Sequence, residues 1–287
     1  MPSLTEKRPQ KPLLSAQLSI GYAGKPPVLR NVEIQIGSGE ILGLVGQSGS
    51  GKSTLAMAVL GLLDRKRTRI EGRIQFEDID LLQLSERELR GLRGRAISLV
   101  LQSPLSSLNP ALKIRTQLKE AWRAHAAGSG ADCDHAIRNS LDSVSLPCDE
   151  EFQGKYPSQM SVGQAQRVLI AMAIMHRPAL LIADEATSAL DVITQSEILS
   201  LFRELNQATG MAIFYISHDL PSVAQICDRI AILHQGEIVE CGAREQIFSH
   251  PQHEYTRRLM SALPQIRAAS QHGAAQRTRA DASVAGR

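Results

Sequence analysis

The sequence predicts an α/β fold built around a mostly parallel sheet. Apolar runs without polar alternation occur at 179–183, 211–216 and 229–233, as expected of strands that are covered on both faces. Helical patterns at about 191–208 and 219–227 separate these runs. An alternation of strands and helices is typical of a parallel sheet with helices packed on its faces.

The composition is that of a folded protein with a mostly aliphatic core. The chain has 287 residues, of which 43% are hydrophobic, 21% charged and 3% aromatic. This length can bury a full core, so a disordered or collagen-like chain is excluded. The formal net charge is +3, but residues 265–287 alone contribute +3 and residues 1–12 are basic as well, which leaves the segment between them slightly acidic. We therefore expect no nucleic-acid partner.

The cysteines and the apolar runs bear on the cellular compartment. Four cysteines are scattered without a C-x-x-C pair, which argues against a zinc site and against a secreted disulfide framework. The N-terminal residues lack the apolar core of a signal peptide, and no apolar run approaches the about 20 residues that a membrane span needs. We expect a soluble chain in a reducing cytosol that can dock on a membrane protein.

The N-terminal part is predicted to contain strands, a glycine-rich loop and a helix, in that order. Val32, Ile34 and Ile36 alternate with polar neighbours, and after a Gly-Ser-Gly turn the run 41–45 is apolar throughout. Helix formers at helical spacing follow at 52–63.

The remaining segments complete the expected order. Further strands are predicted at 70–76 and 96–101, and residues 111–176 read as a helical insertion with helices at 113–127 and 135–144. Pro178 is expected to end the last helix of that insertion before the strand at 179. The segment from 265 onward has no periodicity and is predicted to be disordered.

The glycine-rich loop fits the phosphate-binding pattern G-x-x-x-x-G-K-[ST] in full. Its glycines let successive main-chain N–H groups turn toward a β-phosphate, and the following helix directs its positive end there. Lys52 would reach the β- and γ-phosphates, and the Ser53 hydroxyl would coordinate Mg²⁺. The predicted nucleotide-binding residues of this loop are Gly46, Gln47, Ser48, Gly49, Ser50, Gly51, Lys52, Ser53 and Thr54.

Two adjacent carboxylates follow the apolar strand at 179–183. Asp184 could hold Mg²⁺ through water, while Glu185 could polarise a water molecule against the γ-phosphate. An Asp-Glu pair after a strand is by itself more often a solvated turn. Its position roughly 130 residues after a complete phosphate loop favours the catalytic interpretation.

The order of motifs resembles the ATP-binding subunit of an ABC transporter over about residues 13–264. After the phosphate loop come Gln102, the segment Met-Ser-Val-Gly-Gln-Ala-Gln-Arg at 160–167, the Asp-Glu pair, Ser-Ala-Leu-Asp at 188–191, and His218. Together these motifs are far more specific than any one of them.

The resemblance implies roles for residues outside the phosphate loop. Gln102 would contact Mg²⁺ and sense the transmembrane partner, and His218 would contact the γ-phosphate and join Glu185, Gln102 and Lys52 as catalytic residues. The segment after Met160 would bind the γ-phosphate of the nucleotide on an opposite subunit, through Ser161, Gly163 and Gln164, and Asp191 would bridge the two sites. Tyr22 stands where the family places an aromatic that stacks on adenine. Taken alone, His218 with Asp219 could simply cap a helix, and Tyr22 could be a core residue at the end of a strand.

The resemblance also implies a fold, cofactors and partners. The fold would be a P-loop nucleotide-binding core with an N-terminal antiparallel β portion and an inserted helical subdomain at about 106–176. ATP and Mg²⁺ would be the cofactors, and an identical or different second ATP-binding subunit would pair head to tail with this one. Two transmembrane permease subunits and a solute-binding protein would complete a complex on the cytoplasmic face of the inner membrane. A flexible segment 1–12 would precede the domain at 13–264, and a basic tail at 265–287 would follow it.

One residue departs from the family pattern. The signature usually reads Leu-Ser-Gly-Gly-Gln, whereas Val162 here replaces the first glycine. Because valine is β-branched where glycine allows close backbone approach, we expect a weaker or shifted phosphate contact. Our hypothesis is that the chain works with a different ATP-binding partner and contributes the weaker half of one composite site.

Two segments narrow the resemblance. Residues 102–110 resemble the segment after the glutamine loop of peptide and nickel importers, and 250–264 resemble their C-terminal extension, which we place at about 243–264. No cysteine follows Cys241, so no iron–sulfur cluster is expected there. Two alternatives are an accessory subunit of a non-transport complex such as carbon–phosphorus lyase, and an ABC ATPase of DNA repair or translation. A single nucleotide domain without a long coiled-coil insert argues against the second alternative.

Overall fold

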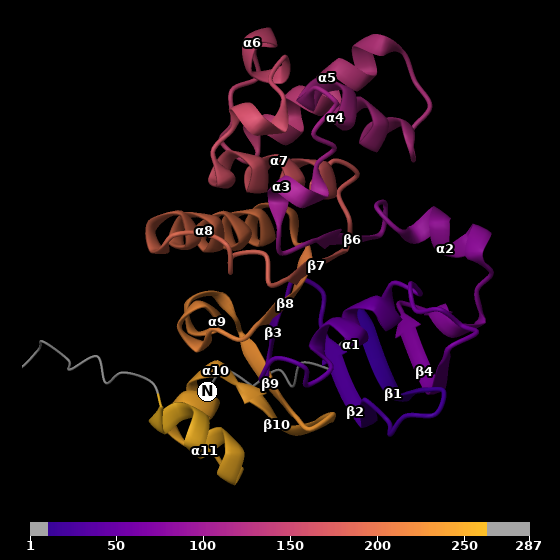
Figure 1. Ribbon diagram of the computed structural model, residues 1–287, viewed down its shortest axis with the longest axis vertical. Helices are drawn as coiled ribbons and strands as arrows, with labels where there is room; N and C mark the ends of the chain where they lie inside the picture. The colour runs from indigo at the N-terminus through magenta and orange to yellow at the C-terminus, as the bar shows by residue number, and fades with distance from the viewer. Residues whose placement is uncertain (1–10, 263–287) are drawn as a thin grey trace, which may run out of the picture.

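The computed structural model describes residues 11–262, and two sheets form its centre. The predictions for the tail at 265–287, and for all but the last two residues of the segment 1–12, lie outside the described residues. The larger sheet runs through the middle of the molecule, the smaller one lies beside it, and a group of helices stands above them (Figure 1).

The larger sheet has six strands, and its inner strands are parallel. The strand order is β10 (Glu237–Ala243), β9 (Arg229–His234), β3 (Ile41–Val45), β8 (Ala212–Ser217), β7 (Leu180–Asp184) and β6 (Ile97–Val100). All neighbouring pairs are parallel except β10 with β9, which are antiparallel. The predicted parallel sheet is confirmed, and the carboxyl ends of its five parallel strands share one edge.

The smaller sheet is antiparallel and lies on the N-terminal side, as the sequence predicts. Its order is β2 (Leu29–Ile36), β1 (Leu14–Tyr22), β4 (Thr68–Phe76) and β5 (Ile79–Asp80). In β2 the predicted alternation is seen, because Val32, Ile34 and Ile36 are buried between exposed neighbours.

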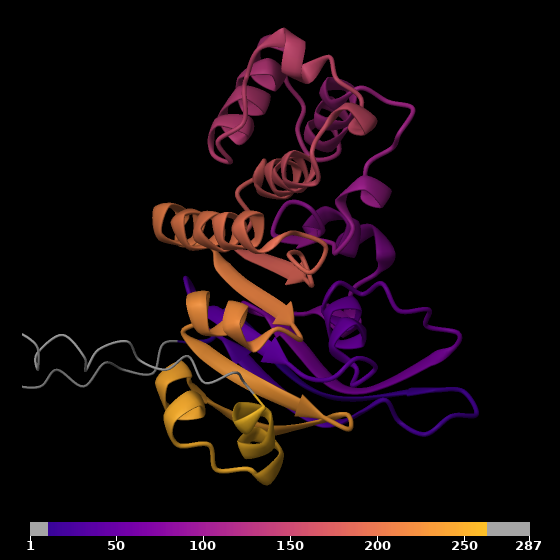
Figure 2. The ribbon, with the colours of Figure 1, turned by 60° about the vertical axis from the view of Figure 1, so that its left-hand side comes forward.

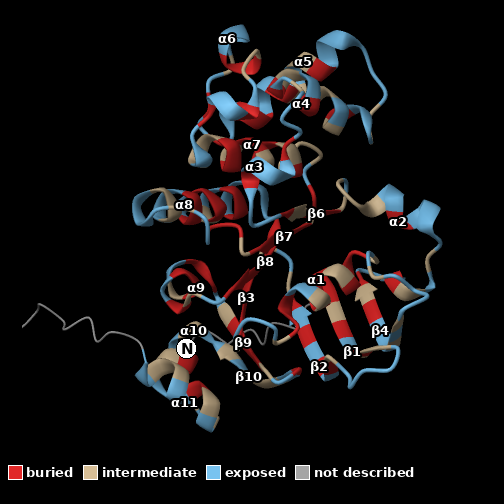
Figure 3. Ribbon diagram, in the orientation of Figure 1, coloured by how far each residue is buried: buried red, intermediate tan, exposed pale blue. Residues whose placement is uncertain are grey.

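Helices cover both faces of the larger sheet, and buried residues follow the strands and the inward sides of these helices (Figure 3). Ile41 and Val45 of β3 join a core with the helices at Val192–Thr209 and Leu220–Ile226, whereas Leu42 and Leu44 join a second core with the helix at Lys52–Val59 and the smaller sheet. The helices are α1 (Lys52–Val59), α2 (Glu86–Leu92), α3 (Pro104–Ser107), α4 (Ile114–Arg123), α5 (Gly130–Asp142), α6 (Glu150–Gln153), α7 (Val162–Ile174), α8 (Val192–Thr209), α9 (Leu220–Ile226), α10 (Arg244–Ser249) and α11 (Glu254–Ser261), with 3-10 turns at Leu81–Gln83 and Pro157–Gln159.

The helices α3 to α7 occupy residues 104–174 and stand apart from the smaller sheet, while α10 and α11 lie beside β9 and β10 (Figures 1 and 2). None of the helices within residues 11–262 has the length and apolar character that crossing a lipid bilayer requires.

Several elements differ from the sequence prediction for local reasons. The helix α1 ends at Val59 rather than at residue 63, because Gly61 adopts a φ of 62°. The helix α5 begins at Gly130, before the predicted start, because Ser129 and Asp132 form a reciprocal capping box. The strand β10 and the helix α2 were not predicted. The helix α2 is largely polar and Leu89 is its only buried residue, while no residue of β10 is buried.

Gly43 in the middle of β3 offers a test of the packing between the sheet and α9. A Cβ at this position would lie 2.7 Å from Cγ1 of Val223 and 2.8 Å from Sγ of Cys227. We expect Gly43→Ala to lower the free energy of unfolding by about 1–3 kcal/mol, as overpacking does. The matched control is Gly91→Ala in α2, where an added Cβ meets nothing within 4 Å, and which should be neutral or slightly stabilising. Urea denaturation measures both variants, and equal stabilities would contradict the predicted difference.

Candidate nucleotide-binding site

The phosphate loop connects the end of β3 to the start of α1, and its glycines are required by its shape. Gly49 and Gly51 have φ values of 78° and 108°, in the left-handed region that other residues rarely adopt. A Cβ on Gly46 would lie only 2.4 Å from the carbonyl oxygen of Leu233. The loop tip at 47–49 is exposed, Ser53 is exposed on the first turn of α1, and Thr54 is half-buried. The predicted residues thus form one continuous segment that runs from the loop into the first turn of α1.

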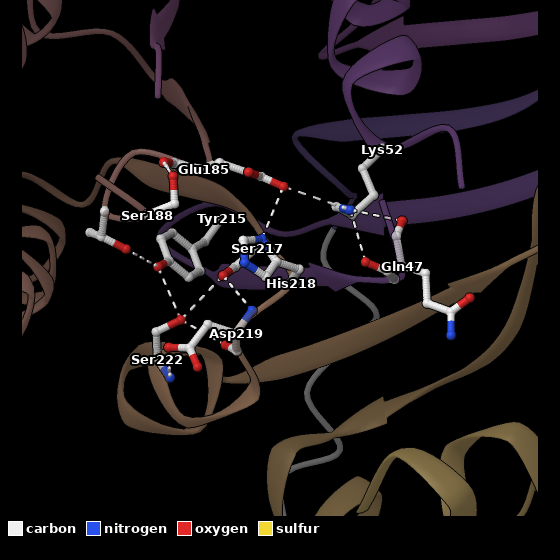
Figure 4. Close-up of polar contacts among 11 residues, drawn as sticks. Gln47, Lys52, Glu185, Ser188, Tyr215, Ser217, His218, Asp219 and Ser222 are labelled. Carbon is white, nitrogen blue, oxygen red and sulfur yellow. Dashed lines mark hydrogen bonds and ion pairs between the residues drawn. The ribbon is translucent and has the colours of Figure 1, made fainter. Parts of the chain in front are cut away.

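Lys52 is buried, and its ammonium group is held by the loop itself (Figure 4). Its Nζ donates to the carbonyl oxygens of Gly46 at 2.8 Å and Gln47 at 3.1 Å, and lies 3.8 Å from Oε1 of Glu185. Burial lowers the pKa of Lys52, while the carboxylates of Glu185 and Asp184 oppose this effect. A cation is thus fixed at the centre of the loop, where a phosphate group would lie.

Asp184 ends β7 beside Lys52 and has an unsatisfied oxygen. Within residues 11–262, its buried Oδ1 has no hydrogen-bond partner. Burial raises the pKa of Asp184, and the nearby Ser53 hydroxyl opposes this rise. A hydroxyl and a free carboxylate oxygen facing one another suit a hydrated Mg²⁺, which keeps several water ligands and usually takes one or two protein oxygens. No group of three or more His, Cys, Asp or Glu side chains in the described part of the chain could enclose a metal, so phosphates and water would supply the other ligands.

Glu185 lies between Lys52 and His218, and all three side chains are drawn together in Figure 4. Its Oε1 lies 3.2 Å from Nδ1 of His218 as well as 3.8 Å from Nζ of Lys52. The backbone φ of Glu185 is 49°, and its N–H donates to the carbonyl oxygen of Ile216 at 2.9 Å. This arrangement can orient and polarise a water molecule next to a phosphate held by Lys52.

A buried hydroxyl network supports this group of side chains, and the sequence did not reveal it. The Tyr215 hydroxyl contacts the Thr187 hydroxyl at 2.9 Å and donates to Oγ of Ser222 at 3.1 Å. The Ser222 hydroxyl lies 3.3 Å from that of Ser217, which accepts from the N–H of Asp219 at 2.9 Å. The network thereby connects the segment after Glu185 to the segment around His218 (Figure 4). The only sequence signal was a tyrosine within the apolar run 211–216.

The helix-capping alternative applies to the neighbour of His218 rather than to His218 itself. Asp219 is the N-cap of α9, and its carboxylate accepts from the N–H of Ser222 at 3.1 Å and from the Gln195 side chain at 2.9 Å. The half-exposed His218 side chain is therefore free to approach Glu185.

A second group of predicted residues lies at the facing ends of α7 and α8. Ser161 caps α7 and forms a reciprocal capping box with Gln164. Asp191 caps α8 and accepts from the N–H and the hydroxyl of Thr194, which lowers the pKa of Asp191. Gly163 meets the same threonine, because a Cβ there would lie 2.7 Å from Cγ2 of Thr194.

The two groups remain separate in one chain. Within residues 11–262, no hydrogen bond or ion pair joins Ser161, Gln164 or Asp191 to Lys52 or Glu185. The structure thus brings Lys52, Asp184, Glu185 and His218 together, and places the signature segment and Asp191 in a different location.

Gln102 lies on the sheet edge that carries the site, whereas Tyr22 lies on the smaller sheet, in a hollow that none of the phosphate-loop residues lines. Gln102 is exposed just beyond the carboxyl end of β6, on the edge of the sheet where Asp184 ends the neighbouring strand. Tyr22 ends β1 and is partly exposed, lining a hollow together with Lys25, Pro27 and Arg69. Its partial exposure leaves one part of the ring available for stacking.

Two family models match this chain. Residues 29–188 match the family described as "ABC transporter", and residues 239–285 match the "Oligopeptide/dipeptide transporter, C-terminal region".

Curated relatives and solved structures agree with these matches. The dipeptide transport ATP-binding protein DppD of Bacillus subtilis is 40% identical over 85% of this chain and 73% of its own length. The glutathione import ATP-binding protein GsiA of Salmonella typhimurium is 40% identical over 87% of this chain, which spans only 41% of that relative. Among solved structures, cbiO1 of Clostridium perfringens, part of an ABC transporter complex, has a TM-score of 0.73 and 26% identity, covering 88% of this chain and 96% of its own. The ATP-binding cassette MJ0796, solved as a dimer bound to ADP and Pi, has a TM-score of 0.69 and 28% identity over 80% of this chain and 98% of its own.

The hydroxyl network around Tyr215 can be tested by removing one oxygen. Tyr215→Phe deletes both hydrogen bonds of that hydroxyl and leaves the Thr187 hydroxyl buried without this partner. We expect the free energy of unfolding to fall by about 1–3 kcal/mol. Tyr156→Phe, at an exposed tyrosine, is the control and should leave stability unchanged. Denaturant titration of both variants measures the difference, and a Tyr215→Phe protein as stable as the parent would refute the importance of the network.

Proposed function

Because the chain belongs to the ABC transporter family of ATP-binding proteins, we propose that it hydrolyses ATP to drive the uptake of a peptide or a related small solute. The observation that supports the hydrolytic part is the convergence of Lys52, Asp184 and Glu185 on the phosphate loop. The match of residues 239–285 to an oligopeptide/dipeptide transporter region supports the cargo class. Nickel is an alternative cargo of this class. The relatives, which are named as transport or import proteins, do not favour a carbon–phosphorus lyase subunit.

The proposed reaction divides the work among this chain's own residues. Lys52 binds the β- and γ-phosphates and neutralises their charge. Ser53 and Asp184 would hold Mg²⁺, and Gln102 would add a contact at the edge of the sheet. When bound there, Mg²⁺ would supply positive charge that offsets the charge developing on the phosphates. Glu185 then accepts a proton from the attacking water, while His218 donates a hydrogen bond toward the γ-phosphate.

The second group of residues is proposed to act on a second ATP-binding subunit. Ser161, Gly163, Gln164 and Asp191 surround the N-termini of α7 and α8, which favour negative charge. Next to Asp191, Val192 and Ile193 are 82% and 75% exposed, and exposed apolar residues at such a place are typical of an interface. Two chains placed head to tail would bring each phosphate loop against the other chain's Ser161. Two permeases and a solute-binding protein at the cytoplasmic face of the membrane would complete the transporter.

The domain boundaries fit this division of work. We propose the nucleotide-binding domain at 13–264, with a helical part at about 106–176 that meets the permeases and an importer-type extension at about 243–264. Purifying the complex from its host and identifying the permease that accompanies this chain tests the proposed uptake function. A phosphonate-degrading assembly in place of permeases would contradict it.

Glu185→Gln tests the assignment of the base. Glutamine keeps the shape of the side chain but cannot accept a proton, so ATP binding should persist while turnover falls by about 100-fold or more. We also expect this variant to accumulate as an ATP-bound dimer, which size-exclusion chromatography with ATP detects. Hydrolysis at the parent rate would remove Glu185 from its role.

Val162→Gly tests the weaker half-site. Val162 is the first residue of α7, in helical conformation, so glycine is not required there for backbone reasons. Glycine also lowers helix stability, so a gain in turnover, rather than any loss, would report how closely the segment approaches the partner's γ-phosphate. We expect the glycine variant to raise ATP turnover of the assembled transporter, and an unchanged turnover would contradict the hypothesis of a weaker half-site.

A further inference from the structure

A hydrogen bond between α8 and α9 connects the two groups of site residues within one chain. Nε2 of Gln195, in the first turn of α8, donates to Oδ2 of Asp219 at 2.9 Å. Asp219 is the N-cap of α9 and directly follows His218. Gln195 lies one turn after Asp191, the N-cap of α8. The bond therefore runs from the helix end beside the signature segment to the residue next to His218.

The N-terminal end of α8 is held in place by several contacts. The Asp191 carboxylate accepts from the N–H groups of Ile193 at 3.1 Å and Thr194 at 3.0 Å, and from the Thr194 hydroxyl at 2.7 Å. The carbonyl oxygen of Asp191 accepts from the N–H of Gln195 at 2.8 Å. The methyl group of Thr194 packs on Gly163 of α7, where an added Cβ would lie only 2.7 Å from it. A displacement of the signature segment or of Asp191 is therefore passed to the backbone of Gln195.

Asp219 fixes the segment that carries His218. Its Oδ2 also accepts from the N–H of Ser222 at 3.1 Å, and its own N–H donates to the Ser217 hydroxyl at 2.9 Å. Between these two held residues, His218 presents Nδ1 at 3.2 Å from Oε1 of Glu185. Because the backbone is held on both sides of His218, the position of its ring depends on the position of Asp219.

A second connection between the two groups follows the chain from Glu185 to Asp191. The N–H and the hydroxyl of Ser188 both donate to the carbonyl oxygen of Glu185, at 3.1 Å each, which makes this segment a tight turn. Within the described part of the chain, the bond from Gln195 is the only hydrogen bond between α8 and residues 217–219. It closes a ring of contacts that runs through Glu185, Asp191, Gln195, Asp219 and His218.

We propose that Gln195 is a positioning residue for His218, through which a nucleotide on a second subunit influences hydrolysis at this chain's own phosphate loop. When that nucleotide contacts Ser161 and the end of α8, Gln195 holds Asp219 and keeps His218 beside Glu185. When the contact is lost, the end of α8 can shift, and the hold on His218 weakens. Binding of ATP at one site and turnover at the other are thereby coupled. The inference rests on the proposed ATP hydrolysis and on the head-to-tail pairing of two subunits.

The experiment measures ATP hydrolysis by the complex that copurifies with this chain, over a range of ATP concentrations. Gln195→Leu keeps the approximate size of the side chain and removes its donor, so we expect kcat to fall by about two- to thirtyfold. The ATP concentration that gives half the maximal rate should stay at the parent value, because the phosphate loop is unchanged. The Hill coefficient should exceed one in the parent and fall toward one in the variant.

Gln225→Leu is the matched control. The Gln225 side chain donates to Oγ of Ser196 at 3.3 Å and so joins the same two helices, but near the C-terminal end of α9. This variant should keep the parent kcat and Hill coefficient, and the melting temperatures of both variants should agree. Parent kinetics in Gln195→Leu, an equal loss in both variants, or a Hill coefficient of one in the parent would overturn the inference.

A double-mutant cycle tests the route through Asp219. Asp219→Ala removes the acceptor, so adding Gln195→Leu to it should lower kcat no further, whereas a further fall by the full factor of Gln195→Leu would overturn this route.

Lys52→Ala separates the inference from the proposed function. If Lys52→Ala hydrolyses ATP at the parent rate, the proposed function fails. If it is inactive while Gln195→Leu has parent kinetics, only the role of Gln195 fails.

Discussion

The placement of a buried cation in the phosphate loop is the constraint on which the site depends. Lys52 is only 5% exposed, and an ammonium group removed from water is costly unless it is paired. Two carbonyl oxygens of the loop and the carboxylates of Asp184 and Glu185 compensate it. These partners are also groups that ATP hydrolysis requires. The contacts that stabilise the buried lysine therefore also arrange the site for ATP.

The parallel sheet allows these contacts to form between distant parts of the chain. β3 lies beside β8, and β8 beside β7, so the segments that follow all three strands emerge at one edge. Lys52, Asp184 and His218 are far apart in the sequence yet each follows or ends one of these strands. Carboxyl ends of parallel strands are a common location for ligand sites for this reason.

The sequence predicted those parts of the fold and site that depend on local pattern. The phosphate loop, the buried parallel strands and the Asp-Glu pair each have a pattern of spacing or composition that can be recognised without the fold. Tyr215 was missed because its importance depends on which hydroxyl groups lie opposite it, and that is set by the packing of distant strands. The strand β10 was missed for a related reason. It is a half-exposed edge strand, so the alternation that would mark it is weak.

The backbone of Glu185 shows how the fold sustains a conformation that its residue type disfavours. A φ of 49° is uncommon for a residue with a side chain, and glycine would adopt it more readily. Glycine, however, would remove the carboxylate that lies between Lys52 and His218. The strained turn is retained because the surrounding hydrogen bonds fix it: the N–H of Glu185 donates to Ile216, and the Ser188 N–H and hydroxyl both donate to the carbonyl oxygen of Glu185. The hydroxyl network around Tyr215 then fastens Thr187, one residue before Ser188, to the β8–α9 segment. The position of the Glu185 carboxylate is therefore a property of the whole β7–β8 edge rather than of one side chain.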